Sequence, residues 1–188
     1  MRRIAVAALV FWAAPANSAE PFETRLAACL ACHGEKGQSA NSGVPSLGGQ
    51  PEFYLTVQLL LFRDKLRVVE LMNAMMRGFS DNDLRNMARF IATLPPPVPA
   101  DGAVDAVRME AGRALAEQNR CNFCHQRDYS GEQNVPRLAG QREDYLVKAL
   151  REYKNNTRRG YDAAMADVLY QISDEQIPDL AYFLARRR

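Results

Sequence analysis

The chain has 188 residues, of which 47% are hydrophobic and 24% charged, and its formal net charge is +2 at pH 7. This balance is typical of one or two small globular domains, and it excludes disordered, collagen-like and multi-span membrane chains. A charge so close to zero also argues against a protein that binds nucleic acid by neutralising phosphates, because that mode needs a clustered basic surface.

The first nineteen residues have the pattern of a secretory signal peptide. Arg2 and Arg3 form a positive start, and Ile4–Ala14 is an apolar run. Small residues follow, and cleavage after Ala19, or after Ala16, fits them. Eleven apolar residues are too few to cross a bilayer as a helix, which disfavours a retained anchor. We therefore expect an exported protein that works in the oxidising periplasm.

Export changes the charge arithmetic. Removal of the first nineteen residues takes away two arginines and no acid, so the mature chain is neutral. Residues 20–98 carry eight basic and eight acidic side chains, and residues 99–188 carry fourteen of each. Neither half of the mature chain therefore has a net charge.

The chain repeats itself. Cys29–His33, with the sequence CLACH, recurs as Cys121–His125, with the sequence CNFCH, at an offset of 92 residues. Val44–Gln50 recurs as Val135–Gln141 at an offset of 91. Later features return in the same order at offsets of 91 to 93, namely Tyr54-Leu55 with Tyr145-Leu146, and Ser80-Asp81 with Ser173-Asp174. The sequence therefore predicts a duplicated domain of about 80 residues.

A proline-rich segment separates the two copies. Prolines at positions 95, 96, 97 and 99 prevent a helix and favour an extended, semi-rigid spacer. We predict a first domain over residues 20–94, a linker over 95–103 and a second domain over 104–188. Both domains are predicted to be all-α, because no segment shows the alternating pattern of a strand.

Corresponding helices are predicted in each copy. Residues 52–65 and 143–155 are the packed helices, whereas the segments 34–51 and 126–141 are rich in glycine and proline and are predicted loops. A last helix in each copy is predicted from apolar residues at helical spacing. Ser80 and Ser173 are its predicted N-caps, and Asp83 and Gln176 stand at capping-box spacing behind them.

The two Cys-x-x-Cys-His strings are the chemical centre of the sequence. Residues i, i+3 and i+4 share one helix face, so both thiols and the imidazole can point at one object. A porphyrin suits this arrangement, with two thioethers on its edge and the histidine on its iron, and the string is typical of covalent haem attachment. We predict two haem c groups, with the thioether residues Cys29, Cys32, Cys121 and Cys124 and the axial ligands His33 and His125.

The cysteines could also serve in a redox disulfide, in a zinc site or in structural disulfides. A redox disulfide of the thioredoxin kind would need a βαβ unit, which the pattern lacks. A zinc site would need a second ligand pair nearby, whereas 92 residues separate the two strings. Two structural disulfides are the remaining alternative for an exported chain.

Methionine is the expected second axial ligand, because both histidines of the chain are already used. After the second string the only methionine is Met165, eight residues before Ser173. The same register selects Met72 in the first copy, with Met75 and Met76 as local competitors. We predict Met72 and Met165 as iron ligands, although a methionine on a helical stripe is commonly part of a core.

Pro45 and Pro136 lie 12 and 11 residues after their histidines. The carbonyl of each proline is a candidate acceptor for the Nδ1 proton of that histidine, which would fix the tautomer of the ring. The alternative is a proline that only shapes a turn.

After the predicted signal peptide the whole chain resembles the soluble dihaem cytochromes c of the cytochrome c4 type. The resemblance rests on motifs of both copies, which are CLACHG at 29–34, VPSLGGQ at 44–50, FSDNDL at 79–84, CNFCH at 121–125 and VPRLAGQ at 135–141, with Met72 and Met165. It implies two class I cytochrome c domains related by a pseudo-two-fold axis, each wrapped around a haem. Gly112 fits the small residue that this family has in the first helix of a domain.

The resemblance also implies a function. It implies an electron carrier, without a catalytic residue, between respiratory partners such as a quinol-oxidising complex and a terminal oxidase or reductase. Contact with a membrane would be peripheral. The alternatives are the cytochrome subunit of a periplasmic dehydrogenase, such as a flavocytochrome c sulfide dehydrogenase, and a dihaem peroxidase.

Overall fold

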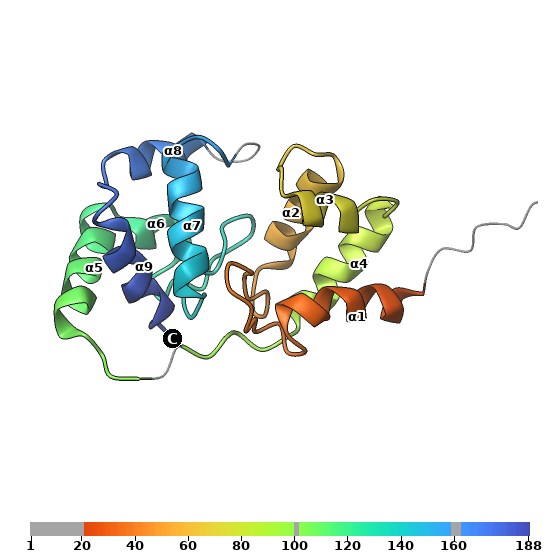
Figure 1. The fold of residues 1–188 in the computed structure, drawn as a ribbon, viewed down its shortest axis with the longest axis horizontal. Coiled ribbons are helices and arrows are strands. Elements are labelled where there is room, and N and C mark those ends of the chain that lie inside the picture. The colour runs from red at the N-terminus through yellow and green to blue at the C-terminus, as the bar shows by residue number, and fades with distance from the viewer. Residues whose placement is uncertain (1–20, 100–101, 159–162) are drawn as a thin grey trace, which may run out of the picture.

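The computed structural model describes residues 21–99, 102–158 and 163–188, so the predicted signal peptide lies outside the described residues. The described helices form two lobes (Figure 1). The first lobe contains α1 (Phe22–His33), α2 (Glu52–Arg63), α3 (Glu70–Met75) and α4 (Asp81–Ala92). The second contains α5 (Ala106–Gln118), α6 (Cys121–His125), α7 (Glu143–Lys154), α8 (Ala163–Tyr170) and α9 (Ile177–Ala185).

The prediction of an all-α protein is confirmed. In the described part of the chain, β pairing is confined to one isolated bridge between Glu132 and Val135, inside a predicted loop. None of the helices described is both long enough and apolar enough to span a membrane. The helices predicted over 52–65 and 143–155 are α2 and α7, each a residue or two shorter at its C-terminal end.

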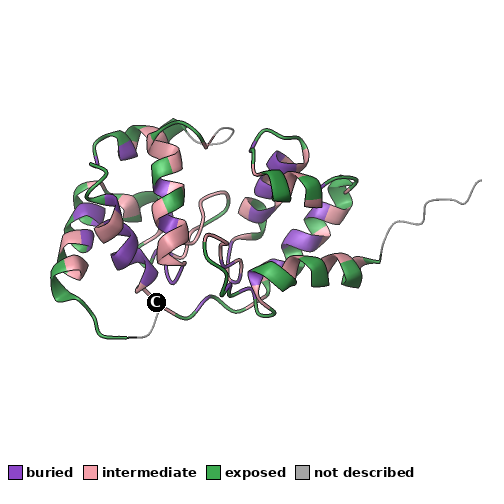
Figure 2. Cartoon of the chain, viewed as in Figure 1, coloured by how far each residue is buried: buried purple, intermediate pink, exposed green. Residues whose placement is uncertain are grey.

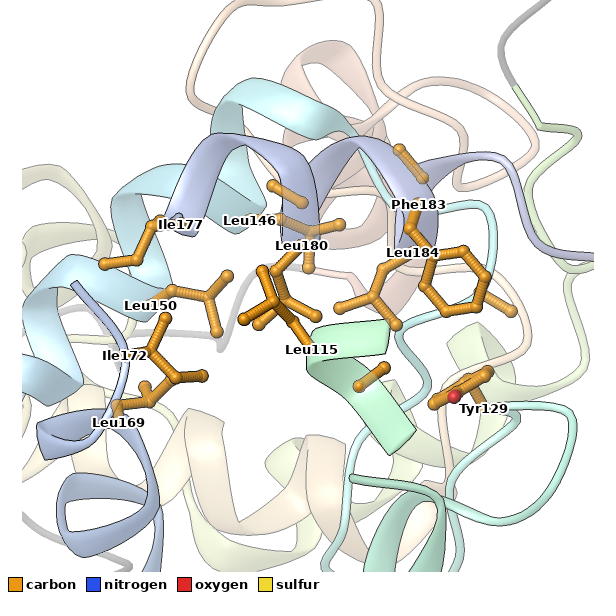
Figure 3. Packing of buried hydrophobic residues seen from close by; sticks show 14 residues of the cluster. Leu115, Tyr129, Leu146, Leu150, Leu169, Ile172, Ile177, Leu180, Phe183 and Leu184 are labelled. Carbon is orange, nitrogen blue, oxygen red and sulfur yellow. The ribbon is translucent and has the colours of Figure 1, made fainter. Parts of the chain in front are cut away.

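Each lobe has its own hydrophobic core. In the second lobe α9 is the central element, and most of its residues are buried between α5 and α7 (Figure 2). Figure 3 shows Leu180 and Leu184 of α9 among Leu115, Leu146 and Leu150. In the first lobe α4 has the same role, and its buried residues at helical spacing pack on α2. These two cores share no residue among those described, so each lobe packs around a core of its own.

The close crossing of α5 and α9 depends on Gly112. A Cβ atom at this position would lie 2.2 Å from the Asp179 carbonyl oxygen and 2.6 Å from Cβ of Phe183. The neighbouring helix therefore fills the space that a side chain would need. This contact explains the small residue that the resemblance implied at Gly112.

Substitution Gly112→Val is expected to destabilise the second domain by about 3 kcal/mol or more. The new side chain would collide with the backbone of α9, which cannot move aside as the end of a flexible side chain could. Urea unfolding followed by circular dichroism measures the loss. Ala114→Val is the matched control, since Ala114 is exposed on the same helix. Equal stability of the two variants would contradict the packing described for α5 and α9.

The N-terminus of α4 is formed as the sequence predicted. The Ser80 hydroxyl accepts a hydrogen bond from the Asp83 amide, and the Asp83 carboxylate accepts one from the Ser80 amide. These two reciprocal bonds form a complete capping box, which satisfies amides that the helix leaves unpaired. The cap fixes the start of α4 close to the short helix α3 that precedes it.

The corresponding prediction for Ser173 is wrong. Helix α9 begins at Ile177, and its N-cap is Gln176. Pro178 stands in the first turn and has no amide hydrogen to donate to the carbonyl of residue 174, so the preceding turn does not continue as an α-helix. One half of the capping box remains, because the Ser173 amide donates to Oε1 of Gln176 at 2.9 Å.

The proline-rich segment runs in extended form from the end of α4 towards the second lobe (Figure 1). Two hydrogen bonds join the backbone of Val98 to the side-chain amide of Gln38, so the segment is held to the first lobe. A Cβ atom at Gly140, which has a φ of +72°, would lie 2.5 Å from the Pro97 carbonyl oxygen. The segment therefore packs on both lobes instead of hanging free as a flexible tether.

Two glutamines join the lobes with pseudo-two-fold symmetry. The Gln50 side chain donates to the Arg137 carbonyl at 2.9 Å and accepts from the Arg137 amide at 3.0 Å. The Gln141 side chain makes the same pair of bonds to the backbone of Ser46, both at 2.8 Å. Gln50 and Gln141 are separated by 91 residues, as are Ser46 and Arg137. The duplication therefore extends to the interface, where the glutamine of each domain bonds to the backbone of the other domain in the same way.

Candidate haem-binding sites

The two Cys-x-x-Cys-His strings end the first helical segment of each lobe. Cys29, Cys32 and His33 lie on the last turns of α1. In the second lobe the chain turns sharply before the string, because Arg120 takes a left-handed φ of 52°, and Cys121–His125 then forms the separate helix α6. The two lobes thus present the same chemical groups on a short helical turn in each case.

The four thiols are unpaired in the structure. The first cysteine of each string is partly buried against the core of its lobe and the second is exposed. Burial raises the pKa of Cys29, and it raises that of Cys121 to about 11. Protonated thiols do not dissociate to thiolate at neutral pH, which disfavours these cysteines as redox nucleophiles.

The alternative of a zinc site receives no support from the geometry. Within the described ranges, no three His, Cys, Asp or Glu side chains gather in a cluster able to hold a metal ion. The two strings lie in different lobes, so their four cysteines cannot make one tetrahedral site.

A proline carbonyl accepts from the histidine of each string. Nδ1 of His33 lies 2.8 Å from the Pro45 oxygen, and Nδ1 of His125 lies 2.8 Å from the Pro136 oxygen. Both rings are buried, at 7% and 4% exposure. Burial lowers the pKa of His33, and the hydrogen bond to Pro45 partly opposes this. A buried ring with a lowered pKa, such as that of His33, stays neutral at neutral pH, and the neutral ring is the form that can coordinate a metal.

Met72 and Met165 occupy equivalent positions in the two lobes. Met72 lies on α3 and Met165 on α8, and both are half-buried at the edge of their cores. The offset of 93 residues that relates them also relates Met76 to Leu169. Met76 and Leu169 are each 1% exposed, as expected of core residues.

The same offset of 93 residues helps to decide between Met72 and Met75 as the iron ligand. It is half-buried like Met72, but the residue 93 positions later is Val168, which has no atom that could bind iron. The structure therefore gives Met76 a role in the core, and the duplication favours Met72 over Met75.

A buried polar cluster at the interface was not foreseen from the sequence. Arg158 donates to the hydroxyl oxygens of Tyr54 at 3.5 Å and Tyr145 at 3.4 Å, and Arg67 donates to that of Tyr145 at 3.3 Å. We call Tyr54, Arg67, Tyr145 and Arg158 the interdomain arginine cluster. A cavity of about 150 Å³ beside it is lined by both arginines and Glu152. The signal that could have revealed the cluster is the offset of 91 residues shared by the two tyrosines and the two arginines.

The fold and these two sites define a chain of two cytochrome c domains. The family model for cytochrome c matches residues 19–95 and again residues 109–187. The chain therefore belongs to the cytochrome c family, with one cytochrome c domain in each lobe.

Its relatives include two-domain members of that family. It is 34% identical over 98% of its length to the thiosulfate dehydrogenase electron acceptor of Thiomonas intermedia, covering 91% of that protein. It is 30% identical to cytochrome c4 of Azotobacter vinelandii, over 90% of this chain and 89% of the relative. The crystal structure of reduced cytochrome c4 from Pseudomonas stutzeri matches with a TM-score of 0.80 at 26% identity, covering 90% of this chain and all of the other.

These similarities confirm the cytochrome c4 resemblance and with it the cofactor. The protein is a dihaem electron carrier, with a haem c attached covalently at each Cys-x-x-Cys-His string. The residues fit this group, since each lobe offers two thiols and a buried imidazole close together on a helical segment. Its function is to transfer electrons and not to catalyse a reaction on a substrate.

Proposed function

We propose that the protein is a periplasmic carrier of single electrons between respiratory partners, with His33 and Met72 as iron ligands in the first domain and His125 and Met165 in the second. The observation that carries this proposal is the repeated geometry of the sites. In each lobe a proline carbonyl lies 2.8 Å from Nδ1 of the histidine, and a half-buried methionine occupies the same register.

Each group of residues has a distinct task in this proposal. The haem, when bound, supplies an iron that takes up and releases one electron. The cysteines hold the cofactor so that it cannot dissociate after export. The prolines Pro45 and Pro136 hold the imidazole rings with Nε2 directed at the iron, which fixes the tautomer. Met72 and Met165 would each supply a thioether sulfur to the iron, which would raise the reduction potential and leave no open position for a substrate.

The interdomain arginine cluster is suited to haem carboxylates. Two buried guanidinium groups face one carboxylate, that of Glu152, and the hydroxyl groups of two tyrosines. A buried positive charge without a counter-charge is unfavourable, and propionate groups of haems that face each other across the interface would supply the missing negative charge. The cluster thus supports a holoprotein in which the two haems meet near the interface.

A dehydrogenase is a specific candidate for the electron donor. The relative in Thiomonas intermedia, at 34% identity, is named as an electron acceptor of thiosulfate dehydrogenase. By analogy, this chain would take electrons from a periplasmic dehydrogenase acting on a reduced sulfur compound. The protein would then be an electron carrier whose donor is a dehydrogenase.

Stopped-flow reduction of the purified, oxidised protein tests the proposed function. A thiosulfate dehydrogenase with thiosulfate should reduce both haems, and a terminal oxidase should reoxidise them. The reduced protein should not turn over hydrogen peroxide, because both axial positions are filled. Rapid peroxide turnover, with one high-spin haem in the spectrum, would instead assign the protein to the dihaem peroxidases.

A further inference from the structure

The interface is symmetric in most of its contacts, which makes a departure from symmetry informative. The glutamine bonds of Gln50 and Gln141 are reciprocal, and Arg67 and Arg158 stand at equivalent positions in the two domains. Each arginine also precedes the proposed methionine ligand of its own domain by a few residues, since Arg67 leads into α3 and Arg158 leads towards α8. A difference between the surroundings of these arginines is therefore a difference between the two haem sites.

The two arginines differ in the group that accepts from them within their own domain. Arg67 donates to Oε1 of Gln58 at 2.6 Å, and this amide is neutral. Arg158 faces a carboxylate, with 3.5 Å between its Nη1 and Oε2 of Glu152. The residue of the first domain that corresponds to Glu152 is Leu61, which is buried and apolar. The first domain therefore has no equivalent of this negative charge.

We propose that Glu152 gives the haem of the second domain the lower reduction potential of the two, so that the first electron settles on the haem of the first domain. The inference rests on the proposed haem ligation. Oxidation of a haem adds one positive charge, and a carboxylate nearby in a partly buried site stabilises that charge. Glu152 also offsets the charge of Arg158, whereas Arg67 keeps its full charge beside the neutral Gln58.

The position of Glu152 ties its effect to the second haem. It lies on α7, and Leu146 and Leu150 of that helix belong to the core against which Met165 packs. Its side chain is 26% exposed and that of Arg158 only 5% exposed, so water screens the pair incompletely. Lys148, at 3.7 Å from Glu152, is half-exposed and compensates the carboxylate only weakly.

The net charge of the two halves does not favour either domain. Residues 20–98 carry eight basic and eight acidic side chains and residues 99–188 carry fourteen of each, so the two halves have the same net charge of zero. The phenol of Tyr145, which belongs to the second domain, accepts hydrogen bonds from both Arg67 and Arg158. Burial alone would raise the pKa of Tyr145, but Arg158 and Arg67 outweigh it and lower this pKa, whereas burial raises the pKa of Tyr54. The more acidic phenol thus also lies in the second domain.

Spectroelectrochemical titration of the holoprotein, with a circular dichroism spectrum of each variant, tests the proposal. The potentials are assigned to the two haems through the variants Met72→His and Met165→His, each of which shifts one of them. Glu152→Gln should raise the reduction potential of the second haem and leave that of the first nearly unchanged. The difference between the two potentials should therefore become smaller. Glu110→Gln is the matched control, because Glu110 also pairs with an arginine but lies exposed on α5.

A second variant in the other domain distinguishes an electrostatic effect of Glu152→Gln from a structural disturbance that this variant could cause. Gln58→Glu places a carboxylate beside Arg67 and should lower the potential of the first haem. An unchanged second potential in Glu152→Gln, or a wild type in which the second haem has the higher potential, would overturn the inference. A wild type without two His/Met haems would contradict the proposed ligation instead, so the two failures are distinguishable.

Discussion

The variant His125→Ala is expected to carry one haem per chain in place of two. Loss of the imidazole removes both the axial ligand and the last residue of the attachment string, so the second domain should not retain its cofactor. A domain of about 80 residues has a marginal core, and without the porphyrin the second domain is expected to lose much of its helical structure. The haem content of the purified protein and its circular dichroism spectrum measure both effects.

The first domain should survive this change. Its buried core residues belong to α2 and α4, together with Met76 directly after α3, and none of them is shared with the second core. The contacts between the lobes are mainly hydrogen bonds, such as those of Gln50 and Gln141. Gln126→Ala, at the neighbouring position, serves as the control and should keep two haems. Loss of both haems from His125→Ala would show that the domains do not fold independently.

The variant Met165→His is expected to keep both haems but to lower the potential of one of them. The second attachment string is untouched, so the cofactor stays bound. Replacing a thioether by an imidazole stabilises ferric iron, and axial ligands tune haem potentials over a range of roughly 0.8 V. The drop should therefore be large in a redox titration, and the iron–sulfur charge-transfer band of the oxidised protein should fall by half.

Met76→Leu is the control for this experiment. Met76 is 1% exposed, and its counterpart in the second domain is Leu169, so leucine should be accepted with little loss of stability. Both charge-transfer bands should persist in this variant. An unchanged potential in Met165→His would remove Met165 from the ligand set, and loss of a band in Met76→Leu would place the first-domain ligand at Met76.

The duplication explains why so much of this fold could be predicted from the sequence. A motif that occurs twice in the same order is a strong signal, and from the sequence alone it indicates two domains and the registers of His33, Met72, His125 and Met165. Apolar residues at helical spacing predicted the buried face of α4, because one continuous stripe of that helix faces the core of the first lobe.

The errors and omissions have local physical causes. The start of α9 was predicted too early, because the missing amide hydrogen of Pro178 outweighs the capping signal of Ser173. The interdomain arginine cluster was missed for a different reason. Arg67 and Arg158 lie in irregular segments that share no motif, and only the three-dimensional arrangement of the lobes brings them to the same two tyrosines.

One optical measurement tests the central claim most directly. The pyridine haemochrome spectrum of the purified, exported protein, combined with its absorbance spectrum in the oxidised state, reports cofactor, stoichiometry and ligation together. We expect a c-type haemochrome at two haems per chain, with the iron–sulfur charge-transfer band of His/Met ligation. A spectrum without covalently bound haem, or with two haems but no such band, would contradict a dihaem carrier with histidine and methionine on each iron.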